Sequence, residues 1–223
     1  MVALPPVGND IVDLAAPGNP GKSGDARFCG RVFTAEERDL LAGAARPDAL
    51  LWALWAAKEA AYKAVSRDDP AVCSIPRQYR VEINGINGDS ALFITGKVIT
   101  PRGELALRIL LTADWVHALA AESEAALDRL CGCVEDLDGA GDPSAFVRGG
   151  LLREIAHLLG FAAGDLSVVK DPDGPGAPGV LFRGRPLATE VSLSHDGRFA
   201  AFAFDPATLS SAVHPGWPRR SFP

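Results

Sequence analysis

PDALLWALWAAKEAAYKAVSR, residues 47–67, is the stretch that decides the fold of the first part of this chain. It is rich in good helix formers and has no glycine or proline in its interior, so it predicts one long helix. Trp55, Glu59 and Lys63 recur every four residues along it and therefore share one stripe of its surface. Taken alone, that stripe favours a solvated Glu–Lys pair that stabilises the helix, so it is not yet a functional signal.

The segments around this helix predict an antiparallel sheet. Residues 8–14, GNDIVDL, are typical of a short strand, and Thr34 with Glu37 has the spacing of a capping box at a helix start. β-branched and aliphatic runs separated by turn residues follow the long helix, in YRVEING, SALFITGKVI and ELALRILLTADWVHALAAE. The first half therefore belongs to the α+β class.

A second, smaller unit follows a polar stretch at residues 135–144, EDLDGAGDPS, which has the composition of a linker. It begins with a helix that we expect to end at Gly160, and Asp196-Gly197 between two strand-like runs predicts a hairpin. LLTADWVHALAA in the first half resembles LSHDGRFAAFA in the second, which favours a duplicated unit.

We therefore predict two similar α+β lobes that pack as a pseudo-dimer, each an antiparallel sheet with a long helix. The predicted lobes are residues 1–134 and 145–208. Residues 209–223 form a tail, and we expect little regular structure beyond Asp205.

Composition excludes several classes of function. The chain has 223 residues, 48% of them hydrophobic, and a net charge of -6, which argues against nucleic acid as a partner. It has neither a secretory leader nor a run of roughly 20 apolar residues, so we expect a cytoplasmic protein that does not enter a membrane. Its four cysteines lack the spacing of a disulfide framework or a zinc site, and we interpret them as reduced thiols.

Asp10 is the first candidate metal ligand. Side chains alternate along a strand, so Asp13 points away from the face of Asp10, and a second carboxylate must come from another element. Glu59 on the long helix is the natural choice, and Mg²⁺ suits a site with one or two protein carboxylates. An aspartate at a strand start that makes only turn hydrogen bonds is the competing interpretation.

Ser194-His195-Asp196-Gly197 is the second candidate, because a hydroxyl and an imidazole beside a tight turn can reach a phosphate. A Ser-His-Asp catalytic triad is excluded, since neighbouring strand residues point to opposite faces. His117 and His157 lie in apolar-patterned segments and are interpreted as core residues.

Three motifs together resemble the 4'-phosphopantetheinyl transferase superfamily. They are Gly8-Asn9-Asp10-Ile11-Val12-Asp13, the segment from Arg27-Phe28 to Phe33-Thr34 with Glu37, and W-x-x-K-E-A-x-x-K from Trp55 to Lys63. The first half looks like a holo-acyl-carrier-protein synthase subunit, and Gly184-Arg185-Pro186 with the S-H-D-G turn looks like the other half of the two-lobed enzymes.

The resemblance implies an Mg²⁺-dependent enzyme that transfers the phosphopantetheine arm of coenzyme A to a serine of an acidic acyl or peptidyl carrier protein and releases 3',5'-ADP. Asp10 and Glu59 would bind the metal, and Glu59 and Lys63 would be catalytic. Lys58, Arg185, Ser194 and His195 would bind coenzyme A. Arg27 and Arg31 would receive the carrier.

Two departures from the family pattern stand out. The S-H turn follows the Asp strand here, whereas it precedes it in the usual two-lobed members, so the lobes look circularly permuted. Val12 stands where many two-lobed members carry an acidic residue, which puts a third protein ligand in doubt. Two alternatives stay open: a non-catalytic relic that still binds coenzyme A or a carrier, and a site built between subunits. The S-H-D-G turn favours a site completed within one chain and hence a monomer.

Overall fold

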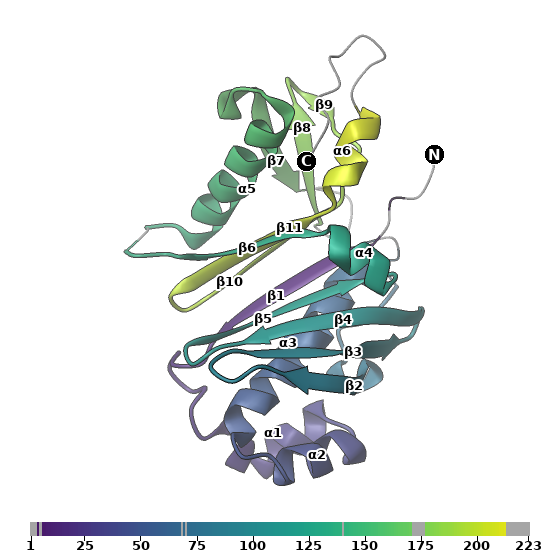
Figure 1. The fold of residues 1–223 in the computed structure, drawn as a ribbon, viewed down its shortest axis with the longest axis vertical. Coiled ribbons are helices and arrows are strands. Elements are labelled where there is room, and N and C mark those ends of the chain that lie inside the picture. The colour runs from purple at the N-terminus through teal and green to yellow at the C-terminus, as the bar shows by residue number, and fades with distance from the viewer. Residues whose placement is uncertain are drawn as a thin grey trace.

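The computed structural model describes residues 4, 6–67, 69, 71–139, 141–170 and 177–212, the last three of these as backbone only. Antiparallel sheets and several helices make up this part of the chain, which confirms the predicted α+β class. Figure 1 shows two units stacked along the long axis of the molecule. A three-stranded sheet of the second unit lies beside the first strand of the first unit, Val7–Asp13.

A five-stranded antiparallel sheet in the order β1-β5-β4-β3-β2 forms the first unit. Its strands are β1 (Val7–Asp13), β2 (Arg80–Asn87), β3 (Leu92–Thr100), β4 (Gly103–Leu111) and β5 (Trp115–Ala121). Every second residue of β3 and β4 is buried, as expected for strands with one covered face. The helices of this unit are α1 (Ala26–Val32), α2 (Ala35–Ala42) and α3 (Pro47–Ser66), with α4 (Glu124–Arg129) after β5.

α3 is the long helix that the sequence predicts, and it packs on β1 and β5. Its buried face carries many alanines, which let the strands approach closely. Gly8 on β1 is required by this approach, because a Cβ there would lie 1.9 Å from the carbonyl oxygen of Ala60. The predicted capping box of Thr34 and Glu37 is also present, at the start of α2. No described helix is long and apolar enough to cross a membrane.

The second unit contains a three-stranded sheet in the order β10-β11-β6 and a separate sheet β7-β8-β9. Its elements are β6 (Cys131–Asp136), α5 (Pro143–Leu159), β7 (Leu166–Lys170), β8 (Pro178–Phe182), β9 (Arg185–Pro186), β10 (Val191–Asp196), β11 (Phe199–Phe204) and α6 (Pro206–Ala212). Short 3-10 turns occur at Lys22–Gly24, Pro76–Gln78 and Ala163–Asp165. Gly160 ends α5 in the left-handed conformation, and β10 and β11 form a hairpin, both as predicted.

The order of elements is similar in the two units. β1, α3 and the β4–β5 hairpin have counterparts in β6, α5 and the β10–β11 hairpin, and the orders β1-β5-β4 and β6-β11-β10 correspond. The units differ in that β2 and β3 extend the first sheet, whereas β7 and β8 form a sheet of their own. This correspondence supports the interpretation of a duplicated unit.

Two details differ from the sequence analysis. The predicted lobe boundary at residue 134 falls inside β6, which pairs with β11, so strand pairing favours a boundary before Cys131. The end of β6, Glu135-Asp136, is polar like the residues after it, so the sequence analysis assigned these two residues to the linker. The segment after Asp205 forms α6, whose first turn is held by the Asp205 carboxylate and where Leu209 is buried in the second core. Residues 213–223 of the predicted tail lie outside the described residues.

Candidate active site between the two units

Asp10 lies where β1 passes α3, and its carboxylate is held from both units. Lys63 Nζ contacts Asp10 Oδ1 at 2.6 Å, and the Ser194 hydroxyl donates to the same oxygen at 2.9 Å. Lys63 also donates to the backbone carbonyl of Asn9. The predicted stripe of α3 therefore does face Asp10, and Ser194 reaches it from β10.

Glu59 shares a pocket with Asp10. The pocket has a volume of about 340 Å³, and its wall includes Trp55, His195 and Asp196. Burial raises the pKa of Glu59, and the negative charge of Asp10 raises it further, while Lys63 opposes both. The nearby lysines of α3 donate to other carboxylates, Lys63 to Asp10 and Lys58 to Glu37, and among the described residues no hydrogen bond to the Glu59 carboxylate is seen. A half-buried carboxylate beside a second one, with a single nearby ammonium, is electrostatically suited to a cation.

The donor set fits magnesium better than a metal that needs a full protein cage. Across the described ranges, no group of three or more His, Cys, Asp and Glu side chains is arranged to hold a metal ion. Mg²⁺ commonly takes only one or two carboxylates and completes its octahedron with water and phosphate oxygens. Asp10 and Glu59 would hold such an ion, and Val12, which lines the same pocket, offers it no side-chain ligand.

A second pocket, of about 270 Å³, adjoins the first and is strongly cationic. The basic groups in its wall are Lys63, Arg67, Arg148, Lys170 and His195. They come from α3 and its end, α5, the end of β7 and β10, so both units contribute. His195 lines both pockets, and the Lys63–Asp10 contact lies at their junction. A ligand with several phosphates would find its counter-charges here.

Sequence reasoning missed Arg67, Arg148 and Lys170. Arg67 lies four residues after Lys63 and extends the stripe of Trp55, Glu59 and Lys63, so that signal was present in the sequence. Its guanidinium pairs with Glu190 and donates to the backbone carbonyls of Pro178 and Val191, which ties α3 to the second unit. Nothing in the local sequence distinguishes Arg148 or Lys170 from other surface cations.

The S-H-D-G turn divides its residues between two faces. Ser194 and Asp196, with Ser192 two residues before the turn, accept hydrogen bonds from backbone N–H groups of β1, whereas His195 is exposed and lines both pockets. Asp196 also lines the first pocket and Ser192 the second. Ser194 is buried, so its hydroxyl serves Asp10 and β1 in this structure. It does not line either pocket wall, in contrast to the nucleotide contact that the resemblance implies.

Two other predicted residues are not brought to the pockets. Lys58 is 1% exposed and donates to both carboxylate oxygens of Glu37, at 2.7 and 2.8 Å, and to the Tyr79 carbonyl. Lys58 precedes Glu59 on α3 and therefore points in a different direction, away from the pocket that Glu59 lines. This position favours a structural role over the predicted contact with coenzyme A. Arg185 is exposed on β9 and lines neither pocket.

His117 is buried, as predicted, and burial lowers its pKa to about 4. It lies 3.4 Å from the side-chain oxygen of Asn9, under the junction of the two units. We therefore assign it to the core.

A carboxylate pair suited to a divalent cation lies beside a cationic pocket, and this arrangement would suit a phosphate-containing ligand. Residues 6–87, which include Asp10, Glu59 and Lys63, match the family model described as the 4'-phosphopantetheinyl transferase superfamily. This match supports the resemblance drawn from the sequence for this part of the chain, and the superfamily that it names implies a transferase activity of the phosphopantetheinyl type in general. No curated protein matches the chain.

Proposed function

We propose that this protein transfers the 4'-phosphopantetheine arm of coenzyme A to a serine of an apo carrier protein, depends on Mg²⁺ and releases 3',5'-ADP. The observation that carries the proposal is the junction at Lys63 and Asp10, where the acidic and the cationic pockets meet. Coenzyme A has a diphosphate that needs both a cation and basic side chains, with a phosphorylated ribose on one side.

In this proposal the cationic pocket holds the nucleotide end of coenzyme A. Arg148, Lys170 and His195 neutralise phosphate charge, and Lys63 balances the charge that grows on the departing 3',5'-ADP. Magnesium, held by Asp10 and Glu59, would supply charge neutralisation at the diphosphate. Arg185 and Lys58 lack positions that support direct contact.

The reaction forms a bond from the serine oxygen to the phosphorus that bears the pantetheine arm and breaks the bond from that phosphorus to the bridging oxygen. The 3',5'-ADP leaves with that electron pair. Glu59 accepts the serine proton, directly or through a water, and its raised pKa makes it a better base than an ordinary glutamate. Glu59 therefore combines the roles of ligand and base.

Arg27 and Arg31 are our candidates for docking the acidic carrier. Both are exposed on α1, and Phe28 between them lines the pocket of Asp10 and Glu59. A carrier bound there would present its serine to Glu59, despite the net charge of -6 on the whole chain.

Both units contribute to the pockets, which supports a site completed within one chain. The edge of β1 is covered by β10 of the same chain, so this edge is not available to a second copy. We therefore propose a monomer, in the cytoplasm where coenzyme A and carrier proteins occur together. Mass measurement in solution tests the oligomeric part of this proposal.

The decisive experiment is intact-mass spectrometry of an apo carrier protein incubated with this protein, coenzyme A and Mg²⁺, with Glu59→Gln in parallel. A mass gain of one phosphopantetheine that needs Mg²⁺ and is lost in the variant supports the proposal. Binding of coenzyme A without any mass gain on several carriers would instead support a non-catalytic relic.

A further inference from the structure

β10 and β1 are joined by hydrogen bonds in which side-chain oxygens of β10, not its backbone carbonyls, accept from the backbone N–H groups of β1. The oxygens of Ser192, Ser194 and Asp196 accept from the N–H groups of three alternate residues of β1, at 2.9, 3.0 and 2.9 Å. These β1 residues are Asn9, Ile11 and Asp13. Each pair is 183 residues apart in sequence, so the two strands run parallel in one fixed register.

That register determines where His195 lies. Side chains alternate along β10, so when Ser194 and Asp196 face β1, His195 points away from β1; it is exposed and lines both pockets, while Asp196 lines the pocket of Asp10 and Glu59 only. A slip of β10 by one residue would turn His195 towards β1. Whatever holds the register therefore also fixes the place of His195 in the walls of the two pockets that Lys63 and Asp10 line.

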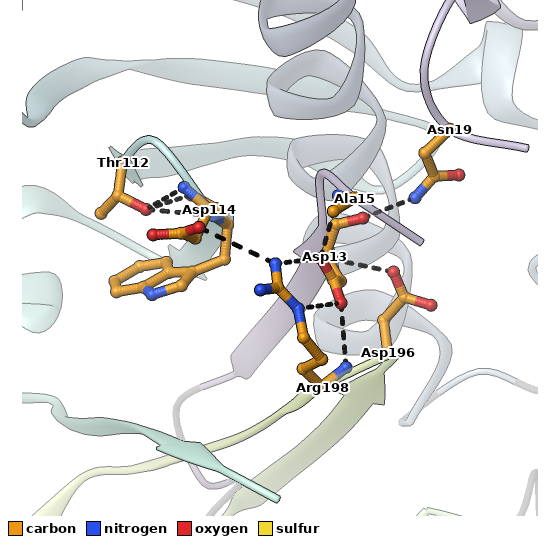
Figure 2. Close-up of polar contacts among 8 residues, drawn as sticks. Asp13, Ala15, Asn19, Thr112, Asp114, Asp196 and Arg198 are labelled. Carbon is orange, nitrogen blue, oxygen red and sulfur yellow. Dashed lines mark hydrogen bonds and ion pairs between the residues drawn. The ribbon is translucent and has the colours of Figure 1, made fainter. Parts of the chain in front are cut away.

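At the turn of the β10–β11 hairpin, an ion pair between Arg198 and Asp13 adds a charged contact to these hydrogen bonds. Arg198 Nε and Nη2 contact the two oxygens of Asp13 at 2.9 and 2.8 Å, and the Arg198 backbone N–H donates to Asp13 Oδ2 at 3.0 Å. Figure 2 shows Arg198 reaching across to Asp13, with Asp196 on one side and Asp114 on the other. The Asp13 side chain is 3% exposed, and its hydrogen bonds to Arg198 lower its pKa to about 2, so it is charged at neutral pH.

Gly197 makes this close approach possible. Its φ is +51°, and a Cβ there would lie 2.4 Å from Asp13 Oδ2. The turn can therefore seat against Asp13 only without a side chain at this position.

We propose that Asp13 and Arg198 are positioning residues for the transfer reaction: their ion pair holds the β10–β11 hairpin in register on β1 and so places His195 at the junction of the two pockets. The proposal rests on the proposed function of His195 in binding phosphate. Neither Asp13 nor Arg198 lines the pockets, so both act through the hairpin.

Arg129 and Asp205 provide a matched control. Arg129 contacts Asp205 at 3.1 Å, with side-chain exposures of 44% and 2%, compared with 50% and 3% for Arg198 and Asp13. This pair joins α4 to the other end of β11 and lines neither pocket. Each pair joins a half-exposed arginine to a buried aspartate; Arg198 contacts both oxygens of Asp13 and lies 3.9 Å from Asp114, whereas Arg129 contacts one oxygen of Asp205 and the Ala125 carbonyl. Only the Asp13–Arg198 pair is next to His195.

The experiment compares Arg198→Met, Arg198→Lys and Arg129→Met with the wild type. Thermal unfolding, the dissociation constant for coenzyme A, and KM and kcat of carrier modification are measured for each. We expect both methionine variants to lose similar stability, but only Arg198→Met to weaken coenzyme A binding, by about 10-fold with a matching rise in KM. Arg198→Lys, which keeps the charge, should recover part of that loss.

Hydrogen exchange provides a readout that does not depend on function. In Arg198→Met the N–H groups of Ile11 and Asp13 should exchange faster than in Arg129→Met. Equal exchange and equal affinity in the two methionine variants would overturn the positioning role. A wild type that neither binds coenzyme A nor modifies a carrier would contradict the proposed function instead, while faster exchange in Arg198→Met would still demonstrate that the ion pair holds the register.

Discussion

Two lysines of α3 each pair with a carboxylate: Lys58 with Glu37, and Lys63 with Asp10 beside Glu59. The two places differ in how completely the carboxylates are paired. Glu37 accepts from Lys58 and from the backbone N–H groups of Thr34 and Val81, so its buried charge is fully paired. At the candidate site, Lys63 and Ser194 both donate to Asp10. Burial and the negative charge of Asp10 raise the pKa of Glu59, and Lys63 offsets this only in part. A protein can bury a carboxylate stably, as at Glu37, so the incomplete pairing of Glu59 is the feature that motivates our proposal of a ligand there.

The largest effect should come from removing the charge of Glu59. We expect Glu59→Gln to lower kcat for carrier modification by about 100-fold or more, because base and metal ligand are lost together. Its stability at neutral pH should be equal to or higher than that of the wild type, since a half-buried, poorly paired charge is removed. Steady-state kinetics and chemical unfolding check both parts. A stability loss as large as that expected for Lys58→Met would contradict the contrast between the two sites.

The two lysines should give opposite results when each is changed to methionine. Lys58→Met leaves the buried Glu37 charge without its partner and should lower the free energy of unfolding by about 3 kcal/mol. The kcat of its folded fraction should stay close to that of the wild type. Lys63→Met should change stability by less than about 1 kcal/mol, because Lys63 is 31% exposed, but should strongly lower kcat. Urea titrations and active-site-normalised rates distinguish these outcomes.

The pH dependence of stability should have opposite signs at the well-paired Asp13 and at Glu59. Asp13 has a folded pKa of about 2, below its value in the unfolded chain, so its stabilisation is complete above about pH 4 and is lost as pH falls towards 2. Comparing Asp13→Asn with the wild type should show a deficit of about 1 kcal/mol at pH 6, allowing for solvent screening at Arg198. That deficit should shrink steadily in acid; a constant deficit from pH 6 to pH 3 would exclude the ion pair as its cause.

Glu59 should show the smallest effect and the reverse trend. Its folded pKa is raised, so whatever it contributes to stability is present below its unfolded pKa and is lost as pH rises through the folded pKa. The stability difference between Glu59→Gln and the wild type should therefore grow with pH without metal. Added Mg²⁺ should reduce it, since a cation stabilises the ionised carboxylate. Unfolding curves at pH 4, 6 and 8, each with and without Mg²⁺, check this.

Most of the first unit could be predicted from local sequence. The helix-forming run of α3, the capping box of Thr34 and Glu37, and the alternating strands each depend on residues within a few positions of one another. The stripe of Trp55, Glu59 and Lys63 follows from helical periodicity alone. Alternation along the first strand indicates that a metal at Asp10 would need its second carboxylate from another element. The hairpin of the second unit and the end of α5 were equally local.

Other features were decided only by tertiary structure, because they depend on which elements meet. No local pattern indicates that β6 pairs with β11, that Ser194 turns to Asp10 while His195 turns to the pockets, or that Arg148 and Lys170 come together with Lys63. Lys58 and Lys63 are the same residue type on the same helix, so local sequence does not predict their partners. In the structure Lys58 is buried against Glu37, whereas Lys63 contacts Asp10. By itself the sequence determined the elements and the chemistry available to them; long-range packing of one unit on the other selected which charges are paired and which are left for a ligand.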